Sequence, residues 1–181
     1  VAVLYFSYRL IQFPIGIFSN SLAQAILPTF STQVLEENQD NLKATLSWGL
    51  RIVFFVMLPA TVIFMVLADR LVFTLFGGGK FDLASGLLTA NALFYYSIGL
   101  TAYAGTKILQ SCFFALKDTV TPTKIAFLAL VMNIVLNAVL MFPLKIGGLA
   151  LATSISGIIS FFFLFFILRR KPHKQNLTKL S

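Results

Sequence analysis

The sequence predicts an all-α protein, a polytopic bundle of transmembrane helices. Three observations predict this fold: 58% of the 181 residues are hydrophobic, 11% are charged, and the mean hydropathy is +0.89. A soluble domain carries about 25% charged residues, so this chain has too little charge to cover a water-facing surface. Because lipid offers the backbone no hydrogen-bond partners, the spanning segments must be helices.

Five apolar runs are long enough to cross a bilayer, which takes roughly 20 helical residues. They contain no acidic residue and cover residues 10–30, 52–68, 87–116, 125–142 and 146–168. Gln12, Asn20 and Gln24 weaken the first run, and Lys107 interrupts the third. We expect each run to form one spanning helix.

A polar segment between the first two runs keeps leucines at helical spacing. Leu42, Leu46 and Leu50 recur every four residues, with Trp48 among them. This pattern predicts an amphipathic helix over residues 32–51 that lies at the membrane interface and leads into the second span.

Turn signals separate the last three runs. In "KDTVTPTKIA", Thr121 is placed to cap a helix and Pro122 to occupy its first turn. The motif "FPLKIGG" predicts a tight turn between the fourth and fifth runs. These two runs are therefore expected to be antiparallel neighbours.

Lysine and arginine are distributed unevenly between the two sides that this topology defines. One side holds Lys43, Arg51, Lys117, Lys124, Arg169, Arg170, Lys171, Lys174 and Lys179. The other holds Arg70, Lys80 and Lys145. Because cytoplasmic loops carry the excess of positive charge, we expect a cytoplasmic basic tail over residues 169–181. The first run then enters from the outer side, with Arg9 near its outer end.

Charge and composition also bound the function. The basic residues do not form one stripe, so the net charge of +8 favours anionic membrane lipid over nucleic acid as a partner. A single cysteine, Cys112, excludes an internal disulfide and a thiolate metal cluster. No nucleophile is paired with a base, so we expect neither an enzyme nor a cofactor or metal. The chain begins with valine and no signal peptide follows, which predicts an internal piece of a longer protein.

Two cations, Arg9 and Lys107, lie among apolar residues. A charge at the middle of a lone spanning helix costs about 2.5–3.5 kcal/mol on insertion scales. Two accounts of Arg9 stay open: it reaches the headgroups by snorkelling, or it binds an anion such as a phosphate in a water-filled cavity. Lys107 lies a helical turn or more from any polar loop, and a structural and a functional role both stay open for it.

Asn133 and Asn137 stand four residues apart and share one face of the fourth run. Thr153 lies in the facing run, among small residues. Amides and hydroxyls bond across packed membrane helices, so these three residues are typical of helix–helix contacts. The alternative is a site for a monovalent cation, although the runs offer no carboxylate to complete it.

Taken together, these motifs resemble the MurJ (MviN) family of bacterial lipid II flippases. The similarity runs through "YRLIQFPIGIFSNSLAQAILPTFS", "WGLRIVFFVMLPATV" and "LFGGGKFD". It is most specific in "DTVTPTKIA", "NIVLN" and "GLALATS", and it covers nearly the whole chain in order. The resemblance implies a piece of the second lobe of a larger two-lobed, all-helical transporter. The first lobe of the same protein would then be a partner of this piece.

The resemblance also implies a function in the bacterial inner membrane. Members move lipid II, a peptidoglycan precursor linked to undecaprenyl pyrophosphate, from the inner to the outer leaflet by alternating access through a cationic cavity. Arg9 matches the family's cavity arginine, and Lys107 matches a lysine of the corresponding span. The family usually has Asp before that arginine, whereas this chain has Tyr8.

For the polar residues of the last two runs, the resemblance implies an ion site. Asn133, Asn137 and Thr153 match positions where sodium-dependent relatives place oxygen ligands, but Asn137 is neutral where a carboxylate is expected. Two other functions remain alternatives: another exporter of the same superfamily, for a polysaccharide-linked lipid or a drug, and a non-transporting membrane fragment. The lack of acids in the runs favours an anionic substrate.

Overall fold

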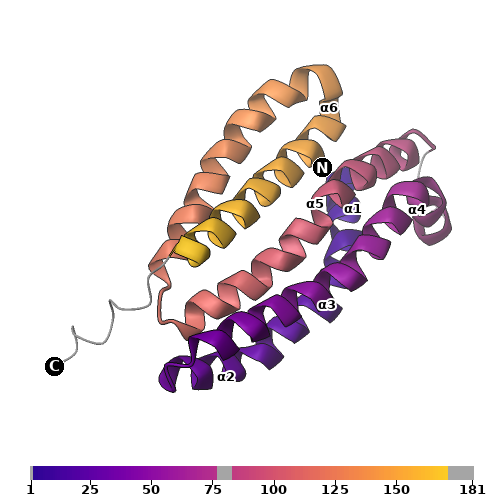
Figure 1. The fold of residues 1–181 in the computed structure, drawn as a ribbon. Coiled ribbons are helices and arrows are strands. Elements are labelled where there is room, and N and C mark those ends of the chain that lie inside the picture. Colours follow the sequence, from indigo (N-terminus) through magenta and orange to yellow (C-terminus); the bar gives the residue numbers. More distant parts are fainter. Residues whose placement is uncertain (1, 77–82, 171–181) are drawn as a thin grey trace.

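The computed structural model describes residues 2–76 and 83–170, and its elements in these ranges are helices. They are α1 (Ala2–Pro14), the π-helix η1 (Ile15–Asn20), α2 (Ser21–Leu35), α3 (Gln39–Val66), α4 (Ala68–Phe76), α5 (Leu83–Ala115) and α6 (Val120–Arg170) (Figure 1). The described part contains no strand, which confirms the predicted all-α fold.

Three described stretches are long and apolar enough to cross a membrane: Val3–Leu35, Gln39–Val66 and Val120–Arg170. The first joins α1, η1 and α2 into one long helix. The third bends back at Lys145, whose φ of 50° and ψ of −123° are not helical. It therefore forms two antiparallel arms, residues 120–144 and 146–170 (Figure 1). Together with α5, which is 33 residues long but is not among these apolar stretches, they give five helices of spanning length, which agrees with the expected number.

The observed helices differ in extent from the predicted runs. The first helix already begins at Ala2, and residues 39–51 continue directly into the second span as the first part of α3. Residues 32–35 belong to the end of α2. A nine-residue helix that the sequence analysis did not predict, α4, follows α3 and buries Ala68 and Val72 on one face.

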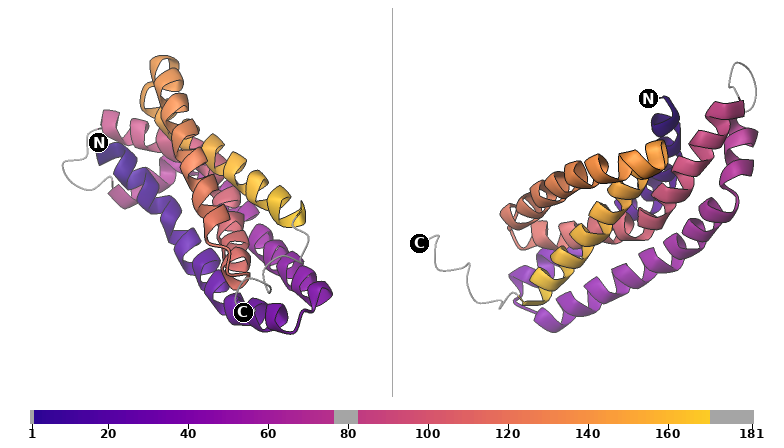
Figure 2. Two further views of the ribbon diagram at one scale, coloured as in Figure 1. Left: turned by 90° about the vertical axis from the view of Figure 1, so that its left-hand side faces the viewer. Right: turned by 90° about the horizontal axis from the view of Figure 1, so that it is seen from above.

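Helix α5 lies at the centre of the bundle and contacts every other helix. The α6 hairpin packs along one side of it, and α3 and the α1–η1–α2 helix lie on the other (Figures 1 and 2). Its fully buried residues include Leu93, Leu100, Ile108 and Phe113. These neighbours cover much of α5, and its hydroxyl side chains Thr89, Ser97 and Ser111 are buried between the helices.

Hydroxyl groups tie the neighbouring helices to backbone carbonyls across the bundle. The bonds, each 2.7 or 2.8 Å long, are Ser7 to Thr89, Ser19 to Ala104, Ser111 to Ala23, and Ser154 to Tyr95. Interhelical hydrogen bonds in membrane proteins average about 0.6 kcal/mol each. They therefore set the register of α5 against α1, η1, α2 and α6 more than they stabilise the bundle.

The helix that carries Arg9 widens to π geometry at Ile15, directly after Pro14. Proline has no N–H to donate, and its ring crowds the carbonyl four residues earlier, which disturbs the α-helical ladder. Insertions of this kind are frequent at functional sites. The sequence analysis did not predict η1.

Two turns at one end of the bundle have the same construction. Glu37 and Lys117 adopt positive φ angles of 54° and 56° after α2 and α5. The next residue then caps the following helix: Asn38 accepts from the Asn41 N–H at 3.1 Å, and Asp118 accepts from the Thr121 N–H at 3.0 Å. The prediction that Thr121 caps α6 is therefore wrong. Helix α6 already begins at Val120, and the Asp118 carboxylate is the group that accepts from a backbone N–H of its first turn.

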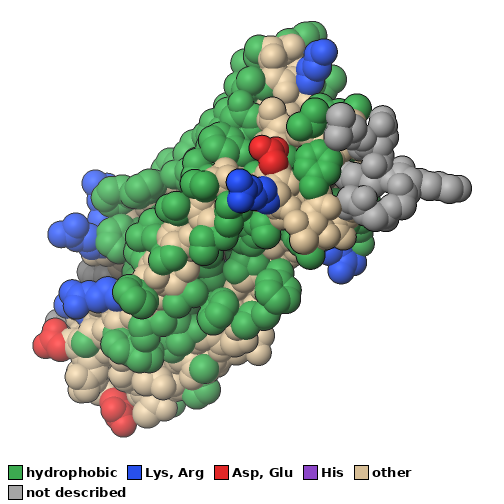
Figure 3. Space-filling view, turned by 90° about the vertical axis from the view of Figure 1, so that its right-hand side faces the viewer, with side chains coloured by type: hydrophobic (Ala, Val, Ile, Leu, Met, Phe, Trp, Pro, Cys, Tyr) green, Lys and Arg blue, Asp and Glu red, His purple; other side chains and the backbone are tan. Residues whose placement is uncertain are grey.

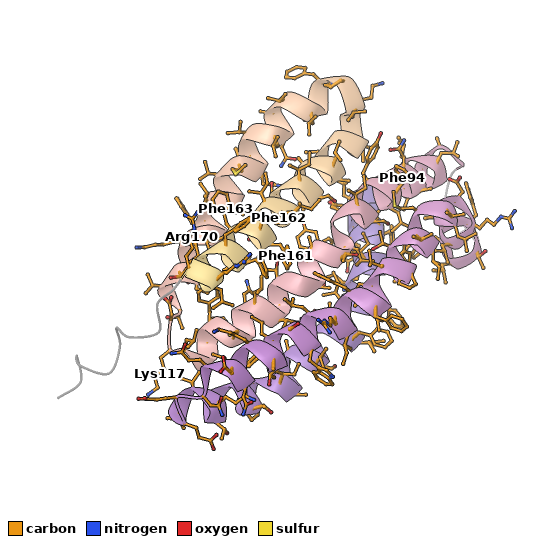
Figure 4. The ribbon with its side chains drawn as sticks, in the orientation of Figure 1. Phe94, Lys117, Phe161, Phe162, Phe163 and Arg170 are labelled. Atoms are coloured by element: carbon orange, nitrogen blue, oxygen red, sulfur yellow. The ribbon has the colours of Figure 1, made fainter. Side chains whose placement is uncertain are left out.

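Hydrophobic side chains cover most of the face drawn in Figure 3, with charged side chains at its edges and an acidic and a basic group side by side near its middle. Lys117 and Arg170 lie at the same end, whereas Phe94 lies toward the other (Figure 4). Lys145, at the tip of the α6 hairpin, also lies at that other end (Figure 1). Lys80 and the tail over residues 171–181 fall outside the described residues.

Candidate functional site

Polar side chains follow one face of α1, which is otherwise an apolar helix. Tyr5, Tyr8, Arg9 and Gln12 are spaced so that they neighbour one another on the helix surface. Tyr5 and Tyr8 are 53% and 45% exposed, and Arg9 is exposed as well. We call these four residues the polar face of α1. The described part of the chain does not cover it.

The Arg9 guanidinium is held by the phenol of Tyr5, one helical turn earlier. Its Nε and Nη2 both donate to the Tyr5 hydroxyl, at 3.0 and 2.6 Å. Its Cζ lies 5.1 Å from the centre of the Tyr5 ring, a distance at which a cation is attracted by the ring face. Because a phenol is neutral, this contact orients the guanidinium without cancelling its charge.

Tyr8 links the polar face of α1 to α5. Its hydroxyl accepts a hydrogen bond from Gln12, and its ring lies edge-on to that of Tyr96, with centroids 6.0 Å apart. On α5, Tyr96, Tyr103 and Lys107 are seven and four residues apart and share one face. The polar face of α1 therefore continues along α5.

Lys107 is exposed on this shared face, one helical turn beyond Tyr103. It lies roughly 16 Å along the helix from Tyr96, since α5 rises 1.5 Å per residue. Arg9 is beside Tyr8, which touches Tyr96, so the two cations occupy different depths of the bundle. The structure thus places both predicted cations on adjoining faces but does not bring them together. They are two separate positions along the bundle rather than one binding site.

The three predicted ion-site residues do come together, between the arms of α6. Asn137 Nδ2 donates to Asn133 Oδ1 at 2.8 Å, and Asn133 Nδ2 donates to Thr153 Oγ1 at 3.2 Å. Thr153 Oγ1 in turn donates to the Leu149 carbonyl at 2.9 Å. The Asn137 Oδ1 atom is buried without a hydrogen-bond partner. This neutral chain of hydrogen bonds joins the two arms, as expected for a helix–helix contact.

A tyrosine connects this chain of hydrogen bonds to the face with the cations. Tyr103 on α5 donates from its hydroxyl to the backbone carbonyl of Thr153 at 2.6 Å. The sequence analysis did not single out Tyr5, Tyr96 or Tyr103. Helical spacing identifies Tyr5 as a neighbour of Arg9, but the roles of Tyr96 and Tyr103 depend on how α1 and α6 pack against α5.

Comparison with known proteins decides the family. The family model described as lipid II flippase MurJ matches residues 1–181. The chain belongs to the MurJ lipid II flippase family. A relative named "Probable lipid II flippase MurJ" in Vibrio cholerae is 35% identical over 181 residues, which are all of this chain and 34% of the relative. "Lipid II flippase MurJ" of Burkholderia cenocepacia is 33% identical over 163 residues, 90% of this chain and 32% of that protein.

A solved structure of the MurJ family supports the same conclusion. "Lipid II flippase MurJ, inward closed conformation" superposes with a TM-score of 0.84 at 27% identity, over 95% of this chain and 36% of that one. The chain spans about a third of the length of the MurJ relatives that it matches. The resemblance to the MurJ family that the sequence shows is therefore confirmed.

Proposed function

We propose that the chain is part of a flippase that moves lipid II from the inner to the outer leaflet of the bacterial cytoplasmic membrane. Family membership supports the proposal, and the exposed guanidinium of Arg9 carries it physically. A charged residue facing acyl chains costs about 2.5–3.5 kcal/mol, and Arg9 has polar neighbours beside it rather than an acid. A face of this kind is stable where the remaining lobe encloses it around water.

Arg9 is the residue that we propose to contact the pyrophosphate of the cargo. Its neutral partner Tyr5 leaves the positive charge available, and guanidinium groups bind phosphate through paired, charge-assisted hydrogen bonds. Lys107, at a second depth on the adjoining face, would hold the headgroup at a later or earlier stage of the passage. The hydrogen-bonded set Asn133, Asn137 and Thr153 would serve mainly to join the arms of α6.

The proposal includes an orientation. The end of the bundle with Lys117 and Arg170 faces the cytoplasm together with the basic tail, and the tip of the α6 hairpin faces outward. Lysine and arginine counts on the two sides support this orientation.

The experiment uses the full-length protein in cells depleted of their own lipid II flippase. We expect Arg9→Ala to abolish growth rescue and the appearance of lipid II in the outer leaflet, at a normal membrane level of the variant. Arg70→Ala, at an exposed arginine of α4, is the matched control and should rescue growth. Full rescue by Arg9→Ala would overturn the proposal, as would outer-leaflet lipid II that is unchanged on depletion.

A further inference from the structure

We propose that Tyr5 is a positioning residue for Arg9. It holds the Nε–Nη2 edge of the guanidinium, so that the end-on pair of N–H groups and the Tyr5 hydroxyl proton are presented together to a phosphate group. The inference rests on the proposed function, because it assigns a role within the same anion contact.

The first argument concerns which guanidinium nitrogens of Arg9 already donate hydrogen bonds to Tyr5. Nε and Nη2 form one edge of the guanidinium, and both point to the Tyr5 hydroxyl. Of the remaining N–H groups, one on Nη1 and the second on Nη2 form the end-on fork that matches two oxygens of a phosphate. A guanidinium fixed by one edge enters that contact with fewer conformations to lose, because its side-chain torsions are already restricted.

The second argument concerns the phenol itself. The hydroxyl oxygen accepts both bonds from Arg9, which leaves its own proton free to donate. A carboxylate at this place would hold the guanidinium equally well but would repel a phosphate. The Tyr5 ring contributes separately, since Cζ of Arg9 lies over it. Replacing the hydroxyl alone therefore tests the positioning contact while the ring contact remains.

The chain offers a matched control one turn further along the same face. Tyr8 is a second exposed phenol of α1, but its hydroxyl bonds to the neutral side chain of Gln12. Tyr8→Phe removes the same atom from the same helix without touching Arg9. A loss of binding affinity that occurs in Tyr5→Phe and not in Tyr8→Phe is then caused by the loss of the contact with the guanidinium.

The test is a double-mutant cycle in the full-length protein, in phosphatidylcholine nanodiscs with undecaprenyl pyrophosphate as the probe. We expect Tyr5→Phe to weaken binding about tenfold, because the phosphate loses the hydrogen bond from the phenol and the guanidinium loses its orientation. In the Arg9→Lys background, which has no guanidinium edge to hold, Tyr5→Phe should weaken binding less than it does beside Arg9, because only the phenol's own hydrogen bond to the phosphate is lost. Tyr8→Phe should stay within about twofold of the unsubstituted protein in both backgrounds.

Several outcomes would overturn the inference. One is a Tyr5→Phe variant that binds the probe as tightly as Tyr8→Phe does, and another is an equal loss in the Arg9 and Arg9→Lys backgrounds. Phosphatidylglycerol that competes as well as the pyrophosphate lipid would identify the anion as an ordinary headgroup instead of the cargo. If Arg9→Ala leaves binding unchanged, the proposed function itself fails.

A second measurement does not depend on the cargo. The Nε–H of a guanidinium held by Tyr5 exchanges slowly with water, so its nitrogen-15 NMR signal should be visible in the unliganded protein. Tyr5→Phe should accelerate this exchange and Tyr8→Phe should not. Equal exchange in both variants would show that Tyr5 does not hold Arg9, whatever the protein transports.

Discussion

A Cβ atom added to Gly148 would lie 2.1 Å from the carbonyl oxygen of Leu140. The two residues belong to opposite arms of α6, and the bend at Lys145 brings them together. No side chain fits at such a distance. The glycine is therefore what allows the two arms to approach so closely beside the turn.

We expect Gly148→Ala to destabilise the full-length protein by about 1–3 kcal/mol, because the added methyl group forces the arms apart. Gly16→Ala in η1 is the matched control, since a Cβ there meets nothing within 4 Å. Unfolding in detergent, followed by circular dichroism, measures both variants. Equal stability of the two would contradict the close approach.

The hairpin also shows what the sequence could predict and why. Pro143 and two glycines frame the turn in "FPLKIGG", so local chemistry alone indicates a tight connection there. The structure confirms it, with the bend at Lys145. The helix start at Val120 is a different case: Asp118 and Thr121 are both good capping residues, and only the turn that ends α5 decides between them.

The turn after α2 gives a second prediction. Glu37 adopts a φ of 54°, whereas its neighbour Glu36 has a φ of −78°. Glycine adopts the first conformation without the steric cost of a Cβ atom, so Glu37→Gly should raise the free energy of unfolding by about 1 kcal/mol. Glu36→Gly should lower it, because flexibility is added without relief of strain. Chemical denaturation of the two variants measures whether the free energy of unfolding rises in Glu37→Gly and falls in Glu36→Gly.

The unpaired oxygen of Asn137 gives a third prediction. Asn137→Asp places a charge beside Asn133 and Thr153, where a sodium ion would supply the missing counter-charge and accept oxygen ligands. We expect the variant to be stabilised by sodium chloride relative to choline chloride, by about 2.7 kcal/mol at a hundredfold excess over Kd. The unsubstituted protein should melt at the same temperature in both salts. A sodium-dependent shift in the unsubstituted protein would show that neutral oxygens suffice for the ion.

The orientation of the bundle gives a fourth prediction. A cysteine at Lys145 should react in intact spheroplasts with a membrane-impermeant maleimide, and a cysteine at Lys117 should react only after permeabilisation. Both positions are exposed, and the native Cys112 is buried and should stay silent. The reverse pattern would place the basic tail outside.

The candidate site was predictable only in part. Arg9 stands out from the sequence pattern alone, because a lone charge among apolar residues costs free energy when the segment enters a membrane. Its partner follows from helical spacing, since Tyr5 is one turn away. The adjoining face of α5 does not follow, because Tyr8 meets Tyr96 through tertiary packing that no local pattern encodes. The depth that separates Lys107 from Arg9 depends on the same packing.

The central position of α5 has a consequence for biogenesis. This helix hides Thr89, Ser97 and Ser111 inside the bundle, and it leaves the ribosome after α1–α4 but before α6. If α5 entered the bilayer alone, these hydroxyls would contact acyl chains. Helices α1, α2 and α3 precede it in the chain and offer surfaces on which the hydroxyls become buried. We therefore expect assembly in chain order, in which α5 docks onto α1, α2 and α3 at the translocon and the α6 hairpin then packs against the remaining side of α5.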